Sequence, residues 1–308
     1  MGKTQRKTRR SFRLLGVFLM AFLSVGLAVA CAYFYKEYND INADIASLDT
    51  QISSLNETVD SKDSEVSSLN STLSDLNNIE ESISRVKEEF FTLALEAHNK
   101  AESGEADFKV CYLTFDDGPY RKTTPTFLDI LDKHDAQATF FLLEKEGDDD
   151  IYLREKISGH TIGNHTASHK IKAIYSSVDS FIADVKENRE FIQNLLGITT
   201  DVMRFPGGSP QAAYMGLDKS AIVSELVDMH YGYVDWNLTT GDGGGYVDVD
   251  ESLHNVIDYS SNFNTLVILM HDYSVNTSLC LDDMLTELEN QGFIFLPLWY
   301  DSPAVKKQ

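Results

Sequence analysis

The chain has 308 residues, of which 43% are hydrophobic, and its formal net charge is −22. That apolar fraction can build a folded core, so the composition excludes a wholly disordered chain. The excess of 48 acidic over 26 basic residues would repel a phosphate backbone, so we expect no nucleic acid as a partner. Three cysteines cannot form a disulfide framework. At most Cys111 and Cys280 could pair, and two unpaired buried thiols are the expectation.

A basic N-terminus precedes an apolar segment. Residues 1–13 hold six basic residues and no acidic one, and Leu14–Tyr35 contains no charged residue over 22 positions. A helix of about 20 apolar residues crosses a bilayer, and its flanking bases stay in the cytoplasm. The segment therefore predicts a single-pass anchor of the cell membrane, with the C-terminal body outside the cell. The alternatives are a secretory signal cleaved after Ala28-Val29-Ala30, which would release the protein, and a lipid-modified Cys31.

Residues 36–96 carry a seven-residue apolar repeat and contain no Gly or Pro. One seam holds mostly β-branched residues and the other mostly Leu, with Lys62 as an interruption: Ile45, Ile52, Val59, Val66 and Leu73, and Ile41, Leu48, Leu55, Leu69 and Leu76. This pattern is typical of a parallel, two-stranded coiled coil. We expect a stalk that forms a parallel homodimer. The alternative is a single long helix that folds back on the catalytic domain.

The composition and the apolar pattern of the sequence change after the stalk. Residues 97–108 are small and polar and predict a linker, and residues 109–308 are the predicted catalytic domain. From Lys109 onward, short apolar runs alternate with amphipathic stretches, as in Val110–Phe115, Thr124–Lys133, Ala138–Leu143, Val178–Leu196 and Leu266–Met270. The alternation predicts an α/β fold with a parallel sheet or barrel. In such folds the active site lies at the carboxyl ends of the strands.

Two pairs of polar residues follow predicted strands and suit a metal. Asp116 and Asp117 end the first apolar run before Gly118-Pro119, a sequence that by itself is often only a turn. His165 and His169 are four residues apart, which would place both imidazoles on one face of a helical turn. Two His and one Asp form a three-ligand set that leaves an open coordination position, as catalytic metal sites require.

Three further motifs lie at predicted strand ends: Arg204-Phe205-Pro206-Gly207-Gly208, Asp235-Trp236 and Leu269-Met270-His271-Asp272. Each has an ordinary structural explanation, namely a loop with a solvated arginine, a strand end and a histidine that caps a core strand. Five polar strand ends in one domain are nevertheless hard to explain by packing, so together they favour an active site.

Taken in order, TFDDGP, HTASH, RFPGG, DW and LMH resemble the motifs of the polysaccharide deacetylases, carbohydrate esterase family 4, over about residues 109–300. The resemblance implies a distorted (β/α) barrel that removes acetyl groups from N-acetylated sugars. It also implies one divalent metal ion, usually zinc, with cobalt and manganese as alternatives.

The resemblance also implies a role for each motif residue. The metal ligands would be Asp117, His165 and His169. Asp116 would be the general base, with Arg204 orienting it, and the backbone N–H of Gly207 would help to bind the oxyanion. Members of the family often have an aromatic residue at the position of Gly207, so its presence predicts a more open pocket.

The last two motifs would complete the site. By the resemblance His271 would be the general acid, tuned by Asp235, and the acetyl pocket would be walled by Trp236 and Leu269. Lys170 stands where family members commonly have a proline after the second metal histidine, which we expect to matter little.

The expected location of the catalytic domain outside the cell favours one substrate over the others. A catalytic domain tethered outside the cell faces the wall, whose peptidoglycan carries N-acetylglucosamine. We therefore expect a bacterial peptidoglycan N-acetylglucosamine deacetylase that acts on carbon–nitrogen amide bonds. The alternatives are a chitooligosaccharide or O-acetyl-xylan esterase, a glycosidase with two carboxyl groups across a glycosidic bond, and a non-catalytic wall-binding protein.

Overall fold

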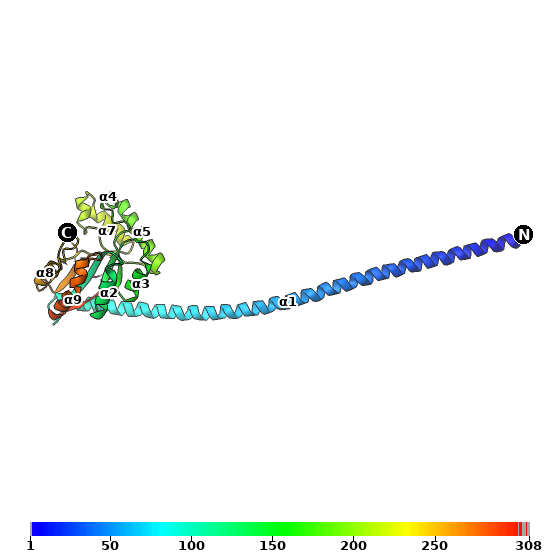
Figure 1. The fold of residues 1–308 in the computed structure, drawn as a ribbon, viewed down its shortest axis with the longest axis horizontal. Helices are drawn as coiled ribbons and strands as arrows, with labels where there is room; N and C mark the ends of the chain where they lie inside the picture. Colours follow the sequence, from blue (N-terminus) through cyan, green and yellow to red (C-terminus); the bar gives the residue numbers. More distant parts are fainter. Residues whose placement is uncertain (1, 301, 304–305, 307–308) are drawn as a thin grey trace. The chain divides into compact units, whose positions relative to one another are not determined.

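The computed structural model describes residues 2–300, 302–303 and 306, with the backbone alone for residues 2–19, 21 and 22. Contacts divide the chain into two compact units, Met1–Ser84 and Arg85–Gln308. A single helix, α1 (Gly2–Glu102), supplies the first unit and the start of the second, as Figure 1 shows. The strands and the other helices all belong to the second unit.

The apolar repeat of the stalk is exposed along α1. The seam residues Ile45, Ile52 and Leu69 leave 50%, 55% and 62% of their surface accessible. A coiled-coil seam needs a second helix to cover it, so the parallel dimer stays a prediction.

The predicted anchor, Leu14–Tyr35, lies within the helical backbone of α1. Among the described residues, no helix combines the length and the apolar character that a membrane crossing requires. The side chains of residues 14–19, 21 and 22 lie outside the described set. The anchor therefore stays a prediction too.

The predicted linker at 97–108 begins too early, because α1 continues to Glu102. Its last turns bury Ala94, His98 and Ala101, which lie on one helical face. The ring of Phe91 stacks on Trp299 with centroids 5.4 Å apart, and Nδ1 of His98 lies 3.1 Å from the Tyr112 hydroxyl. This apolar face extends the helix where the polar composition alone indicated a loop.

The predicted catalytic domain is built on a parallel sheet, which confirms the predicted α/β class. The strand order is β5-β4-β3-β2-β1-β7-β6, and β8 pairs with β1. The strands are β1 (Lys109–Gly118), β2 (Ala138–Leu142), β3 (Thr161–Asn164), β4 (Val202–Met203), β5 (Gly232–Tyr233), β6 (Leu238–Thr239), β7 (Thr265–His271) and β8 (Phe293–Phe295). Among the described residues β5 and β6 do not pair, so the sheet is a curled, open form of the expected barrel.

Strand β1 runs through the middle of the core because its side chains are apolar on both faces. Cys111, Leu113 and Phe115 pack into one cluster with residues of α2 and α9, while Val110 and Tyr112 pack into another. Successive side chains of a strand point to opposite faces, so this continuous apolar run suits a strand covered on both sides. Cys111 and Cys280 are buried and unpaired, which confirms the expectation for these thiols.

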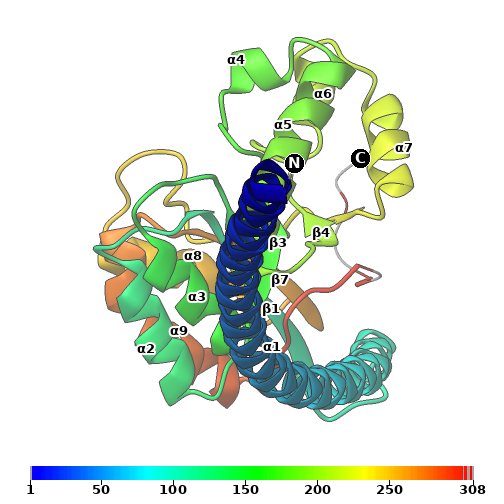
Figure 2. The same ribbon diagram turned by 90° about the vertical axis from the view of Figure 1, so that its right-hand side faces the viewer.

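Helices cover the sheet between successive strands. They are α2 (Thr124–Lys133), α3 (Asp149–Ile157), α4 (Ile171–Ile174), α5 (Val178–Leu196), α6 (Gln211–Tyr214), α7 (Lys219–Asp228), α8 (Val249–Ser260) and α9 (Val275–Asn290). Figure 2 shows α2, α3, α8 and α9 grouped together, with α4 to α7 gathered at another part of the domain. The longest, α5, starts at Ser177, which caps the N–H of Ser180, and ends at Gly197 in the left-handed conformation (φ 67°).

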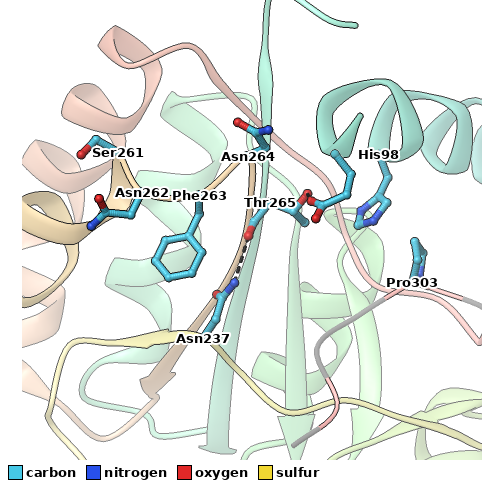
Figure 3. Close-up of a pocket in the computed structure, with 9 residues that line it drawn as sticks. His98, Asn237, Ser261, Asn262, Phe263, Asn264, Thr265 and Pro303 are labelled. Carbon is cyan, nitrogen blue, oxygen red and sulfur yellow. Dashed lines mark hydrogen bonds between the residues drawn. The ribbon is translucent and has the colours of Figure 1, made fainter. Parts of the chain in front are cut away.

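A cavity of about 470 Å³ lies at the amino-terminal edge of the sheet, between the end of α1 and the start of β7. Figure 3 shows the Asn237 amide donating to the carbonyl of Thr265 at 2.9 Å. The Thr265 hydroxyl in turn donates to Glu102 at 2.7 Å, which ties α1 to the sheet. Thr265 begins β7 and His271 ends it, so the predicted site lies at the opposite edge.

Candidate active site

The carboxyl ends of the central strands meet around a second cavity, of about 480 Å³. Parallel pairing of β1 with β7 sets Asp116 beside His271. On the other side of β1, the strand order places the end of β3, with Asn164 and the following histidine, two strands away. The cavity wall includes most of the predicted site residues: Asp116, Asp117, His165, His169, Gly207, Trp236, Leu269 and His271. The other two, Arg204 and Asp235, are completely buried.

Asp117, His165 and His169 bring one ligand atom each to within 4.8 Å of one another. The Nε2 atoms of both histidines lie 3.5 Å from Oδ1 of Asp117. That oxygen is buried and, among the described residues, has no hydrogen-bond partner. A buried carboxylate oxygen without a donor is costly, and a cation between the three atoms would satisfy it. One carboxylate and two imidazoles are ligands that zinc accepts, so the residues fit a divalent metal ion.

Hydrogen bonding fixes the tautomer of His165. Its Nδ1 lies 2.9 Å from the carbonyl oxygen of Arg204. A carbonyl only accepts, so Nδ1 carries the proton and Nε2 keeps its lone pair for a metal. Burial lowers the pKa of His165 to about 3, which keeps the ring neutral even against the attraction of Asp117.

The two histidines reach the site from a loop and not from the expected helical turn. Residues 165–170 lie between β3 and α4 without helix, and both Thr166 and His169 have positive φ, 67° and 53°. Asn164 holds this loop by accepting from the N–H of Thr166, and Asp184 accepts from the N–H and hydroxyl of Ser168. These bonds bring the imidazole centroids to 5.0 Å in place of helical geometry.

Arg204 orients Asp116 from beneath the cavity. The Nη1 atom of Arg204 donates to Oδ1 of Asp116 at 2.9 Å and to the Thr114 hydroxyl at 2.7 Å. The rest of the guanidinium donates to the carbonyls of Val234 and Asp235, at 3.3 and 3.1 Å. Burial raises the pKa of Asp116, and the charge and hydrogen bond of Arg204 oppose that rise. The free oxygen, Oδ2, is left facing the histidine cluster, 3.6 Å from Nε2 of His165.

The carboxylate that holds His271 is Asp242, so the expected pairing with Asp235 is wrong. Nδ1 of His271 lies 2.8 Å from Oδ1 of Asp242, whose Oδ2 accepts from the His271 backbone N–H and the Thr277 hydroxyl. Asp235 instead accepts from the N–H and hydroxyl of Ser209, at 2.8 and 2.7 Å. It therefore braces the loop that carries Gly207.

Sequence reasoning missed Asp242 because that residue lies in a glycine-rich run after the short strand β6. The available signal was one acidic residue among several glycines, at Gly241-Asp242-Gly243-Gly244-Gly245. The glycine at 243 is required, because a Cβ there would lie 2.3 Å from Cε1 of His271.

Charge around His271 favours its protonated form. Burial lowers the pKa of His271, but the hydrogen bond to Asp242 and the negative charge of Asp116 outweigh it and raise the pKa above its usual value. Asp242 shows the reciprocal effect: burial raises its pKa, yet the bond from His271 and its other donors lower it overall. The site thus places a candidate proton donor, His271, and a buried carboxylate, Asp116, in the same cavity as the candidate metal ligands.

Glycine residues form part of the cavity wall beside Trp236 and Leu269. Gly207 and Gly208 adopt φ of 78° and 86°, and a Cβ on Gly208 would lie 3.0 Å from the Trp236 ring. The loop is held by the Tyr175 hydroxyl, which donates to the Pro206 carbonyl at 2.9 Å. Tyr273, which sequence reasoning did not single out, closes the opposite wall with its ring centroid 5.1 Å from that of His271.

Substitutions should separate the metal ligands from the neighbouring carboxylate. His165→Ala removes a ligand, so we expect divalent-metal affinity to fall by more than the roughly 10–100-fold that supporting groups contribute. Asp116→Asn should keep the affinity within about 10-fold of the native value. Cobalt titration of the metal-free chain, followed by absorbance, measures both. Equal loss in the two variants would make Asp116 a ligand as well.

Comparison with known proteins identifies the family. The family model described as polysaccharide deacetylase matches residues 103–222. A peptidoglycan-N-acetylglucosamine deacetylase of Bacillus cereus is 31% identical over 194 residues, which is 61% of this chain and 68% of the relative. A chitin deacetylase of Colletotrichum lindemuthianum is 29% identical, over 59% of this chain and 74% of the relative.

Solved structures agree with this relationship. The catalytic domain of a peptidoglycan N-acetylglucosamine deacetylase from Eubacterium rectale matches with a TM-score of 0.62 and 32% identity, over 65% of this chain and 93% of that domain. The region matched by the family model, residues 103–222, contains the three candidate metal ligands, Asp117, His165 and His169. The chain therefore belongs to the polysaccharide deacetylase family, carbohydrate esterase family 4.

Proposed function

We propose that this protein is a metal-dependent peptidoglycan N-acetylglucosamine deacetylase, which hydrolyses the amide bond of the N-acetyl group. One observation carries the proposal: two ionisable side chains are held in place beside one set of candidate metal ligands. Arg204 fixes Asp116, and Asp242 fixes His271. Relatives from Bacillus cereus and Eubacterium rectale bear the name of this activity, which supports the choice of substrate.

The ion held by Asp117, His165 and His169 would supply Lewis acidity toward the acetyl carbonyl and the attacking water. Zinc suits this donor set, with cobalt and manganese as alternatives. The buried Asp116 can accept the proton of the water because Arg204 fixes its carboxylate, and burial raises its pKa, which makes it a stronger base. The two adjacent acids therefore divide their roles, one as a ligand and one as a base.

The tetrahedral intermediate and the leaving group need partners of their own. The backbone N–H of Gly207, in the cavity wall, is our candidate for the oxyanion donor. An amine leaves poorly as an anion and needs a proton, which His271 can donate in its cationic form. Trp236 and Leu269 provide apolar surface for the acetyl methyl group.

Acetate release tests the function directly. The metal-loaded chain should release acetate from peptidoglycan faster than from chitopentaose or acetylated xylan. A preference for chitopentaose would shift the assignment toward the activity named for the Colletotrichum lindemuthianum relative, and a preference for xylan toward an O-acetyl esterase. New reducing ends without acetate would indicate a glycosidase. Neither product, with the metal bound, would leave a non-catalytic wall-binding protein.

The pH dependence of the rate should follow His271. Because its pKa is raised above 6.5, His271 stays protonated into higher pH, and kcat should fall only as that proton is lost. Asp242→Asn removes the main stabilising partner, so the alkaline limb should move to lower pH without loss of bound metal. Asp235→Asn is the matched control and should leave that limb in place. A pH–rate profile in which Asp235→Asn alone moves the limb would contradict this assignment.

We extend the proposal to the N-terminal half. The apolar segment Leu14–Tyr35 would anchor the protein in the cell membrane, and the exposed seam of the stalk would pair two chains in parallel. Residues 36–308 should then sediment as a dimer and residues 85–308 as a monomer in analytical ultracentrifugation. Lys62→Leu should tighten the dimer, since it replaces the one charged residue in the seam. Monomers for both fragments would contradict the coiled coil.

A further inference from the structure

The turn that carries the metal ligand Asp117 is bound along its whole length by one neighbouring segment. Lys145 Nζ donates to the carbonyls of Asp117 and Pro119, the latter at 3.2 Å. The carbonyl between them, that of Gly118, accepts from the backbone N–H of Leu143 at 3.1 Å. Three successive carbonyls of the turn are therefore held by residues 143–145, which follow β2.

This turn needs support because Asp117 lies in the left-handed region, with φ of 69°. That conformation is unfavourable for a residue with a Cβ. It also aims Oδ1 of Asp117 at both histidines, each at 3.5 Å. A small relaxation of the backbone toward an ordinary φ would swing this oxygen away from the other two ligand atoms.

Lys145 is itself held firmly. Its ammonium lies 3.3 Å from the centroid of the Tyr120 ring, within the range of a cation–π contact. Its backbone N–H donates to the Tyr152 hydroxyl at 3.1 Å, and that hydroxyl donates to the Leu143 carbonyl. Tyr152 is completely buried, so the segment is anchored in the core. The ammonium thus has a fixed position from which to hold the turn.

We propose that Lys145 is a positioning residue of the metal site, whose ammonium holds the Asp117 turn in its strained form and thereby sets the affinity for the divalent ion. The inference rests on the proposed metal-dependent function. Lys145 is not among the residues that line the catalytic cavity, so it acts through Asp117 and not on substrate. Groups that orient metal ligands in this way are typically worth 10–100-fold in affinity.

The test compares two lysines that each donate to backbone carbonyls. Lys156 Nζ donates to the Leu196 carbonyl at 2.8 Å, at the end of α5, and provides the matched control. Metal-free full-length chain is titrated with Co²⁺, and binding is followed by the visible absorbance of the ion. Lys145→Met should weaken Co²⁺ binding by about 10–100-fold, while Lys156→Met should leave it within about 3-fold of native. The metal-free variants should melt at similar temperatures.

Activity separates positioning from catalysis. At a Co²⁺ concentration that saturates Lys145→Met, we expect kcat and KM for acetate release to return to within a few-fold of native. Native Co²⁺ affinity in Lys145→Met would overturn the inference, as would an equal loss in Lys156→Met. A native chain that binds no Co²⁺ would instead overturn the proposed metal-dependent function, so the two failures are distinguishable.

Chemical rescue covers the case in which Lys145→Met folds poorly. Lys145→Cys is made in a Cys31→Ser chain, because Cys31 is exposed whereas Cys111 and Cys280 are buried. Reaction with 2-bromoethylamine forms a thioether that returns an ammonium at nearly the length of lysine. Co²⁺ affinity should recover after this reaction and not after reaction with iodoacetamide, which adds a neutral amide. Recovery with both reagents, or with neither, would overturn the role of the ammonium.

Discussion

The buried ion pair between Arg204 and Asp116 is the contact on which the rest of the site depends. The arginine is completely enclosed, and its bonds reach β1, the segment after β5 and, through its own carbonyl, the ring of His165. Removing one partner of such a pair leaves an uncompensated buried charge, which typically costs about 3–5 kcal/mol. Arg204 thus sets the geometry of the proposed base and of a proposed metal ligand together.

The local backbone conformation gives the adjacent carboxylates of Asp116 and Asp117 different partners. Asp116 still belongs to the regular, register-paired part of β1, so its side chain points down to Arg204. The register shifts between Asp116 and Gly118, and Asp117 takes a positive φ that turns its side chain toward the histidines. One irregular residue at a strand end therefore separates the proposed proton acceptor from the proposed metal ligand.

The candidate general acid, His271, is also held by a buried partner of opposite charge. Asp242 accepts from both the ring and the backbone N–H of His271, which fixes the imidazole and favours its protonated form. Asp235, once expected in this position, braces the Gly207 loop through Ser209, and its carbonyl accepts from Arg204. The proposed base and acid are consequently held by separate hydrogen-bond networks, while the charges of Asp116 and His271 still couple their pKa values.

The sequence by itself determined the α/β class, the parallel sheet and nearly all residues around the cavity. It could do so because buried parallel strands are continuous apolar runs whose carboxyl ends meet at one edge, so polar residues just after such runs converge. Asp117, His165 and His169 are brought together in this way. These features depend on local composition and on the rules of sheet topology alone.

Only the tertiary structure decided which groups touch. It placed Asp242 in place of Asp235 beside His271, set the two histidines on a loop, carried α1 on to Glu102 and brought Lys145 to the Asp117 turn. Each of these depends on contacts between segments far apart along the chain, or on positive φ values stabilised by such contacts. These contacts cannot be predicted from hydrophobic periodicity or motif spacing, because the packing of the whole domain determines which groups form hydrogen bonds.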